Sequence, residues 1–283
     1  MGGNCEFMAL KRGKIHSRIS LQAENLEELY AGYNHRKFVH PDPLEFLYGY
    51  PDIHERELVG LIASSLAYGR VTQILKSVAS VLKKMDGSPR SFLMESPREE
   101  IFKAFKTFRH RFTTGEEIAC MLLGAKRVLN KYGSLYECFM QGLKDDTETV
   151  LPALSFFVEQ VGNSYLEEKN SLLPSPGKGS ACKRLNLYLR WMVRKDIIDP
   201  GGWNRVPMSK LIIPLDTHMH RICLSLGMTA RKQADMRTAV EITHAFKRLS
   251  PQDPVRYDFA LTRLGIRKDA DRDKFLEQCT PTI

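Results

Sequence analysis

Apolar residues recur with helical spacing along most of this chain of 283 residues. Turn and capping residues separate the helical stretches, whereas the alternation with period two that marks a half-buried strand is scarce. The pattern therefore predicts an all-α fold. The expected helices cover residues 22–32, 53–68, 71–86, 97–108, 115–131, 147–162, 180–195, 217–227, 234–249 and 254–265.

Three expected helices begin with recognisable capping residues. Residues 96–99 and 114–117 have the spacing of a capping box, in which a Ser or Thr and a Glu each bond the backbone of the other. Asp253 stands directly before Pro254, which suits an N-cap followed by the first helical position. The segments 163–179 and 196–210 contain turn residues and are expected to be loops.

Charge favours an acidic partner without identifying it. The chain has 42 Lys and Arg against 33 Asp and Glu, a net charge of +9, and such a protein attracts polyanions. No apolar run is long enough to span a membrane, and the N-terminus lacks the apolar core of a secretory signal. We therefore expect a soluble cytoplasmic protein with no membrane partner.

Cysteines and histidines do not have the spacing of a metal site. The six cysteines, at positions 5, 120, 138, 182, 223 and 279, show neither a CxxC pair nor a zinc pattern. His218 and His220 are two residues apart and would point to different sides of a helix. We expect reduced, mostly buried thiols, and neither a metal nor a cofactor.

A tight turn rich in Pro and Gly precedes one of the expected helices. It runs from Leu173 to Gly179 and leads to Lys183. Such a turn directs backbone N–H groups and the positive end of the helix dipole outward, which suits a phosphate. We therefore predict that Gly177, Lys178 and Gly179 contact the backbone of a nucleic acid.

The helix after this turn is expected to have one apolar and one basic side, since successive residues rotate by about 100°. The basic side comprises Lys183, Asn186, Leu187, Arg190 and Arg194. We predict that Arg190 and Arg194 extend the phosphate-binding surface, which positions a duplex without reading its sequence. The alternative is an ordinary solvated helix surface.

Lys183 is a candidate nucleophile. It lies in the first turn of its helix, near Lys178 and Arg184, where the dipole and the neighbouring charges disfavour a protonated amine. A Schiff-base nucleophile must be a neutral amine. The alternative is a surface lysine without a chemical role, which describes almost every lysine in a protein.

Asp216 is a candidate partner for that lysine. Pro214 ends any preceding helix, and Asp216 stands at the N-cap of the next one, where it can accept from the amides of His218 or Met219. A fixed negative charge would stabilise a sugar that becomes oxocarbenium-like as its base departs. The alternative is an N-cap with a structural role only.

Three segments, in this order along the chain, resemble the helix-hairpin-helix DNA glycosylase superfamily of endonuclease III, the adenine glycosylase and the 8-oxoguanine glycosylases. They are Leu173-Pro174-x-x-Gly177 with a following lysine, Asp216-Thr217-His218-x-x-Arg221, and residues 257–265. Residues 57–70 are similar to the first barrel helix of that superfamily. Residues 184–194 and 199–203 resemble more closely an uncharacterised prokaryotic branch usually placed near these enzymes, and the likeness spans roughly residues 55–266.

The resemblance implies two helical lobes with a cleft between them. We divide the chain into an N-terminal segment over 1–54 that packs with the C-terminal lobe, a barrel-like lobe over 55–183 that ends in the hairpin, and a C-terminal lobe over 184–283. By position, Lys183 corresponds to the superfamily nucleophile, because a Lys-x-x-Asn pattern begins the helix after the hairpin, and Asp216 corresponds to the carboxylate that assists base loss. An ungapped alignment brings Lys178 to the catalytic position instead.

The chain departs from the superfamily pattern in several places. A span of 33 residues separates Lys183 from Asp216, which is longer than usual and leaves room for residues 199–203 as an insertion. Trp203 in this insertion either stacks on an extruded base or packs the loop. The four-cysteine iron–sulfur loop of many endonuclease III relatives is missing, so no cluster is expected.

Some relatives insert a polar residue of the first barrel helix into the gap that the flipped base leaves. No residue is an obvious match here, and Tyr68, Arg70 and Gln73 are the candidates. These three side chains and Trp203 are the predicted contacts around the base.

The expected function is repair of double-stranded DNA by a base-excision glycosylase with AP-lyase (abasic-site lyase) activity. We favour an oxidised purine such as 8-oxoguanine as the substrate, because bifunctional relatives that lack the cluster commonly take it. The resemblance implies no obligate protein partner and a cytoplasmic location at the nucleoid. The alternatives are a non-catalytic DNA-binding protein of the same fold and a helical protein that binds RNA or another acidic partner.

Overall fold

The computed structural model describes residues 22–162, 170–267 and 271–279, and these residues are mostly helical. The all-α prediction is therefore confirmed. The elements in chain order are a helix over 22–33, η1 (Arg36–Phe38), η2 (Pro43–Gly49), α2 (Ile53–Ser65), α3 (Val71–Lys83), α4 (Pro89–Glu95), α5 (Arg98–Phe105), β1 (Arg109–His110), β2 (Thr113–Thr114), α6 (Gly115–Tyr132), α7 (Leu135–Gly142), α8 (Leu151–Gly162), η3 (Pro176–Lys178), α9 (Lys183–Val193), η4 (Met208–Lys210), α10 (Thr217–Ser225), α11 (Met236–Leu249), α12 (Asp258–Ile266) and α13 (Arg272–Gln278).

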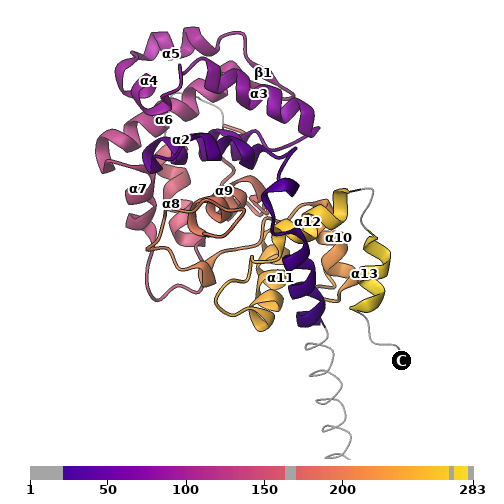
Figure 1. Ribbon diagram of the computed structural model, residues 1–283. Helices are drawn as coiled ribbons and strands as arrows, with labels where there is room; N and C mark the ends of the chain where they lie inside the picture. Colours follow the sequence, from indigo (N-terminus) through magenta and orange to yellow (C-terminus); the bar gives the residue numbers. More distant parts are fainter. Residues whose placement is uncertain (1–21, 163–169, 268–270, 280–283) are drawn as a thin grey trace, which may run out of the picture.

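Helix α9 lies near the middle of the molecule, between two groups of helices (Figure 1). The first group contains α2 to α8 with the small hairpin, and within it α7 packs on α8 and α5 on α6. The second group contains α10 to α13. Because α9 also packs along α2, its first residue is held against the first group.

The helix over 22–33 joins the second group, although it is the first of the described elements along the chain (Figure 1). The side-chain amide of Gln22 donates to the Leu226 carbonyl at 3.0 Å. Glu27 accepts from the hydroxyl of Tyr257 at 2.6 Å and from Arg256 at 2.9 Å. These contacts fasten the helix over 22–33 to the end of α10 and to the turn before α12. The proposed boundaries at residues 54 and 183 stay a prediction.

One of the three predicted caps forms as expected. Thr114 and Glu117 make a complete capping box at the start of α6. Ser96 instead closes α4, and α5 begins after Pro97 with no side-chain cap, so the box predicted over 96–99 is wrong. The helix start predicted at Asp253 is also wrong, because α12 begins only at Asp258.

The sequence pattern missed the short elements. Helices α4, α7 and α13 were not predicted, and neither was the antiparallel hairpin of β1 and β2, in which Arg109 pairs with Thr114 and His110 with Thr113. A two-residue strand is too short to show an alternating pattern. Helices of seven or eight residues similarly give fewer than two and a half turns of periodicity.

A glycine permits the crossing of α6 and α8. A Cβ atom at Gly124 would lie 1.9 Å from the carbonyl oxygen of Val161, far inside any contact distance. Any other residue would therefore push the two helices apart and open the core around Leu122 and Phe157, both of which are fully buried.

A buried acid connects α2 to the start of α7. Glu57 is fully buried, and its two carboxylate oxygens accept from the amides of Leu135 at 2.9 Å and Tyr136 at 3.0 Å. Burial raises the pKa of Glu57 to about 7, although these two hydrogen bonds oppose the shift. The carboxyl group thus stays protonated in the folded protein at pH values where it is ionised in the unfolded chain.

We expect Glu57 to make the protein less stable as the pH rises. Between its ordinary pKa of 4.5 and its folded pKa of about 7, the native state holds a proton that the unfolded state has lost. The stabilisation is thus present below pH 4.5 and is lost by about pH 7, and it amounts to about 3 kcal/mol. Urea unfolding at several pH values would measure the free energy of unfolding of wild type and of Glu57→Gln. As the pH rises, the wild-type value should fall relative to that of the variant. Parallel pH profiles would contradict this assignment.

Candidate active site

Lys183 and Asp216 come together although 33 residues separate them in the chain. Their Nζ and Oδ2 atoms are 3.9 Å apart, and the two side chains are 32% and 34% exposed. Lys183 is the first residue of α9, and Asp216 is the N-cap of α10. Two remote helix starts therefore present an amine and a carboxylate to each other, with both groups open to solvent.

The residue before Lys183 fixes how α9 begins. Cys182 adopts a left-handed backbone conformation with φ of 47°, which costs a non-glycine residue about 1 kcal/mol. Its side chain is buried, and its Sγ lies 3.5 Å from the carbonyl oxygen of Pro174. Burial raises the pKa of this thiol, which is consistent with a packing role for Cys182.

Arg184 fastens the same helix start to two other segments. Its guanidinium donates to the carbonyl oxygens of Ser65, at the end of α2, at 2.7 Å and of Ser171 at 2.6 Å. It also lies 5.0 Å from the centre of the Tyr68 ring. The backbone around Lys183 is therefore held from both sides.

Asp216 is held by the first turn of α10. Its Oδ1 accepts from the amides of His218 and Met219, both at 2.9 Å, as the sequence predicts. Its other oxygen, Oδ2, is the one near Lys183. One oxygen of the carboxylate is thus structural, and the other remains available for chemistry.

Lys183 lines a pocket of about 360 Å³ between the two groups of helices. The residues around it come from the segment before α2, from the α2–α3 turn and the start of α3, from α9, and from the end of α12 with the residue after it. They are Phe38, His40, Pro41, Asp42, Pro43, Ala67, Val71, Ile74, Lys183, Leu187, Arg263, Ile266 and Arg267. The lining is mostly apolar, with several cations and one acid, and its volume falls in the range of small-molecule sites.

Apart from Lys183, the charged residues of this pocket are ones that the sequence did not single out. Arg263 is 3% exposed, forms an ion pair with Asp42 and lies 4.5 Å from the centre of the Phe259 ring. Arg263 belongs to the third segment that carries the family resemblance, and this was the available signal. Its partner Asp42 lies 221 residues away in the chain, so no local pattern could have joined them.

The predicted role of Arg190 and Arg194 is wrong. Both side chains are 3% exposed and cannot reach a phosphate outside the protein. Arg190 pairs with Asp199 and Asp258, and Arg194 pairs with Asp196, Asp199 and Asp253. Burial alone would lower the pKa of each guanidinium, but the surrounding carboxylates raise both above the ordinary value. This side of α9 is an internal ion-pair network.

The turn before α9 lies at the surface. Gly177, Lys178 and Gly179 are all exposed; the first two belong to the short η3 element, and Gly179 directly follows it. Gly179 has a φ of 83°, a conformation that suits glycine, and its carbonyl accepts from the Met236 amide at 3.2 Å. The turn is therefore braced against α11 while its outer side faces solvent.

Trp203 does not line a base pocket. It is fully buried and stacks on Tyr136 with ring centres 5.4 Å apart, and it also contacts Phe139, Phe157 and Tyr188. The proposed base contact is therefore wrong, and the alternative of loop packing holds. Residues 199–203 follow α9, and Asp199, Gly201 and Trp203 among them are buried.

The three candidates at the α2–α3 turn differ in exposure. Tyr68 is half-buried, and its hydroxyl is engaged with the carbonyl of His110 at 2.8 Å and with Thr113 at 2.7 Å. Arg70 and Gln73 are exposed. This turn leads from Ala67 to Val71, both of which line the same pocket as Lys183. None of the three candidates lines that pocket directly.

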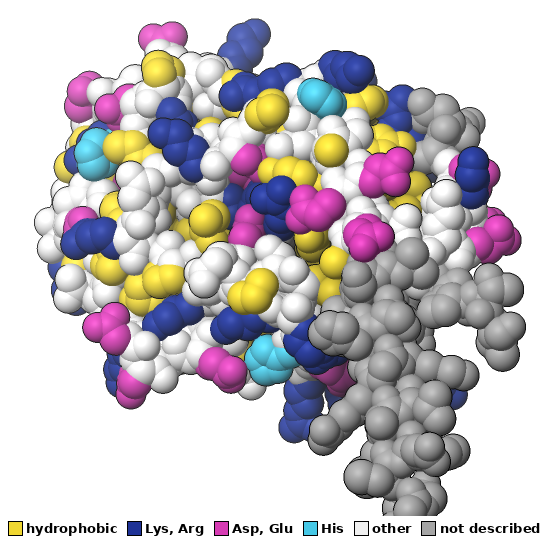
Figure 2. Space-filling model, turned by 60° about the horizontal axis from the view of Figure 1, so that its bottom comes forward, with side chains coloured by type: hydrophobic (Ala, Val, Ile, Leu, Met, Phe, Trp, Pro, Cys, Tyr) yellow, Lys and Arg dark blue, Asp and Glu magenta, His cyan; other side chains and the backbone are white. Residues whose placement is uncertain are grey.

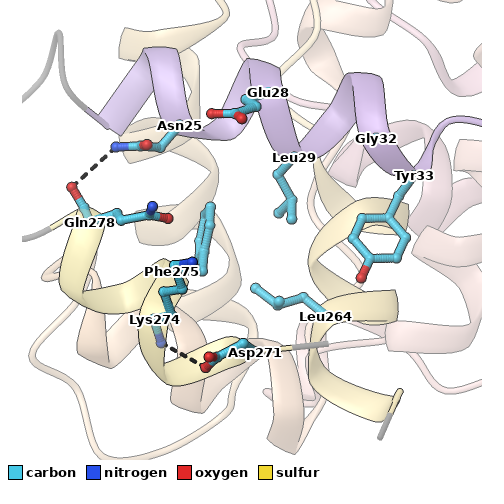
Figure 3. Close-up of a pocket in the computed structure, with 10 residues that line it drawn as sticks. All are labelled: Asn25, Glu28, Leu29, Gly32, Tyr33, Leu264, Asp271, Lys274, Phe275 and Gln278. Carbon is cyan, nitrogen blue, oxygen red and sulfur yellow. Dashed lines mark hydrogen bonds between the residues drawn. The ribbon is translucent and has the colours of Figure 1, made fainter. Parts of the chain in front are cut away.

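A second pocket, of about 340 Å³, lies between the helix over 22–33 and α13 (Figure 3). Leu29, Leu264 and Phe275 form its apolar part, and polar side chains such as Asn25 and Glu28 surround them. The pocket contains neither member of the Lys183–Asp216 pair. It is therefore separate from the candidate site.

Surface charge alone does not locate a binding face. On the side of the molecule shown in Figure 2, Lys and Arg side chains alternate with Asp and Glu and do not form one patch. Within the described ranges, no group of three or more His, Cys, Asp or Glu side chains could hold a metal ion. None of the helices in the described part of the chain is both long and apolar enough to cross a membrane.

Comparison with known proteins gives one match. The model of a family described as a protein of unknown function covers residues 42–267, a range that includes the Lys183–Asp216 pair and all the pocket residues except Phe38, His40 and Pro41. No curated protein matches this chain, and no solved structure matches it.

Proposed function

This chain belongs to the family Protein of unknown function (DUF2400), and we propose that it is a DNA base-excision glycosylase with AP-lyase activity. Lys183 is the nucleophile, and Asp216 is the carboxylate that assists it. The observation that carries the proposal is the 3.9 Å separation of Lys183 Nζ from Asp216 Oδ2 at a solvent-open site. The substrate is duplex DNA with a damaged base, and we favour an oxidised purine.

The chemistry begins at the anomeric carbon of the damaged nucleotide. The lone pair of Lys183 Nζ forms a bond to C1′ while the N-glycosidic bond breaks. The electron pair of the broken bond leaves with the base, which takes up a proton. Positive charge develops on the sugar, and the Asp216 carboxylate stabilises it. Asp216 Oδ2 then accepts the proton that Nζ releases, through a water or after a small side-chain movement, because catalytic contacts often tighten only when substrate binds.

The later steps follow from the covalent adduct. Opening of the sugar ring converts the amine adduct into an imine. Loss of a proton from C2′ then drives elimination of the 3′ phosphate, which cleaves the strand. Water finally hydrolyses the imine and regenerates the Lys183 amine. The only groups of this chain that the scheme needs are one amine and one carboxylate.

The surroundings of the pair support this use. Lys183 opens onto an apolar pocket of about 360 Å³, and an extruded base requires an apolar, stacking environment. The exposed turn over 177–179, immediately upstream, is suited to hold a phosphate through its backbone and Lys178. An oxidised purine has polar edge groups, and Arg263 and Asp42 at the pocket are candidates to recognise them.

Trapping with borohydride tests the proposal. Wild-type protein mixed with a duplex containing 8-oxoguanine should give a covalent protein–DNA adduct, since borohydride reduces an imine to a stable amine. Lys183→Ala should give none, whereas Lys178→Ala should still form it and serves as the matched control. The Lys178 alternative predicts the opposite pair of results.

The trapping assay and a measurement of DNA binding together separate the glycosylase from a non-catalytic DNA-binding protein. If wild type binds duplex DNA in a salt-dependent manner but forms no adduct with damaged or abasic DNA, the chain is a non-catalytic DNA-binding protein. In that case the Lys183–Asp216 ion pair has a structural role only. Tighter binding to RNA than to duplex DNA in competition would instead favour an RNA partner.

A further inference from the structure

The hairpin of β1 and β2 exposes an aromatic side chain. Phe112 is 79% exposed, the largest value among the exposed large hydrophobic residues of the described chain, and Ile197 follows at 51%. Leaving a Phe side chain in water forgoes about 1.5 to 3 kcal/mol relative to burial. The chain thus holds its most exposed large apolar group at the tip of a two-residue turn.

This hairpin is held in place by buried groups. The Tyr68 hydroxyl donates to the His110 carbonyl and contacts Thr113 Oγ1, which joins both strands to the α2–α3 turn. His110 is fully buried, and its ring nitrogens lie 2.9 Å from Ser77 Oγ and 3.1 Å from the Tyr68 carbonyl. Phe112 is therefore presented from a rigid base.

Arg111 completes the turn in a strained conformation. Its φ of 53° lies in the left-handed region, which residues other than glycine adopt only rarely. Its side chain covers Gly69, where a Cβ would lie 2.7 Å from Arg111 Cδ. The guanidinium lies 5.5 Å from the centre of the Phe112 ring and 5.9 Å from that of Tyr68. The cation thus lies near both aromatic rings.

The segment over 101–115, which carries Phe112, is basic, although the exposed Glu100 and Glu116 flank it. Residues 101–115 contain no Asp or Glu, whereas Lys103, Lys106, Arg109 and Arg111 are exposed. Beside the hairpin lies a hollow of about 280 Å³ between α3 and the strand, lined by Gln73, Lys76, Ser77, Ser80, Lys84, Thr107, Phe108 and Arg109. Cations and small hydroxyl groups together suit the oxygens of a phosphate.

We propose that the tip of this hairpin is a nucleic-acid contact, in which Phe112 stacks on bases while Arg109 and Lys76 bind backbone phosphates. Exposed cations beside an exposed aromatic ring bind nucleic acids through charge together with stacking, which in a duplex requires a base face left open where a step is unstacked or a base is extruded. The partner is the duplex DNA of the proposed function, because the hairpin is bonded to the turn that lines the Lys183 pocket. The choice of duplex DNA as the partner rests on the proposed function. Binding through stacking and charge does not depend on the Lys183 chemistry.

Duplex binding measured by fluorescence anisotropy at several salt concentrations tests the two parts separately. Phe112→Ala should weaken binding about tenfold, because one aromatic–base stack is lost. The slope of log affinity against log salt should not change, since no charge is removed. Arg109→Gln and Lys76→Gln should each weaken binding and lower that slope by about one.

Two further variants sharpen the result. Phe112→Trp should keep wild-type affinity, because a larger ring also stacks, and Met94→Ala removes another exposed apolar side chain on α4 and should change nothing. Equal affinity of Phe112→Ala and wild type would overturn the inference, as would loss of binding in Phe112→Trp. Phe112-dependent binding to anionic phospholipid vesicles with unchanged DNA binding would also overturn it, in favour of a membrane.

The outcomes distinguish this inference from the proposed function. If wild type forms no borohydride adduct but its DNA binding depends on Phe112, the chemistry fails and the hairpin contact stands. If the adduct forms and Phe112→Ala binds normally, the chemistry stands and the hairpin contact fails. Absence of any duplex binding by wild type overturns both.

Discussion

Replacing Asp199 with alanine should lower the free energy of unfolding by about 3 to 5 kcal/mol. The Asp199 side chain is fully buried between two arginines, and it accepts from Arg190 Nε at 3.1 Å and Nη2 at 3.0 Å as well as from Arg194. Removing it leaves two buried guanidinium groups with fewer partners, and a buried charge without compensation is costly. Denaturant unfolding monitored by circular dichroism would measure the loss.

Two companion variants test the cause of this loss. Asp199→Asn keeps one acceptor oxygen but removes the charge, so its effect should lie between wild type and Asp199→Ala, and it provides a measurement if the alanine variant does not fold. Asp145→Ala removes an exposed acid and should change stability by less than about 0.5 kcal/mol. A loss below about 1 kcal/mol for Asp199→Ala would mean that the remaining acids compensate both arginines.

Asp216→Asn should reduce the rate of base release by about a hundred to a thousand times, if the proposed chemistry holds. The amide keeps an oxygen that can accept from His218 and Met219, so the start of α10 should remain capped. What is lost is the negative charge 3.9 Å from Lys183 Nζ. Single-turnover kinetics on a duplex with a damaged base would measure the effect.

The second half of the assay isolates the role of the charge. With DNA that already contains an abasic site, no glycosidic bond has to break, and Asp216→Asn should still form the borohydride adduct through Lys183. Asp52→Asn is the matched control, because Asp52 caps α2 with the same kind of amide bonds but lies outside the site. Normal base release by Asp216→Asn would remove the carboxylate from the mechanism.

The sequence predicted the fold class and the meeting of two distant side chains. Helical periodicity located the long helices. The capping rules placed Asp216 at the start of α10, where its side chain caps the helix as expected. The proximity of Lys183 to Asp216 came only through a family resemblance, because no local pattern joins positions so far apart. The roles of these residues stay a prediction.

Sequence periodicity failed where partners are remote. It can show that Arg190 and Arg194 share a side of a helix, but it cannot show what covers that side. The covering acids, Asp199, Asp253 and Asp258, come from three other places in the chain. The hairpin was missed for a related reason. Each of its strands has only two residues, too few to show an alternating pattern, and a hydrogen bond from the distant Tyr68 hydroxyl helps to hold it in place.

Helix α9 has a consequence for how the molecule can be divided. The helix packs along α2. Arg190 in α9 pairs with Asp258, the first residue of α12, and Arg194, directly after α9, pairs with Asp253 in the turn before α12. A fragment that ended after α9 would expose two unpaired cations, and one that began after it would expose buried acids. We therefore expect neither half to fold when expressed alone, and the intact chain to melt in a single cooperative transition.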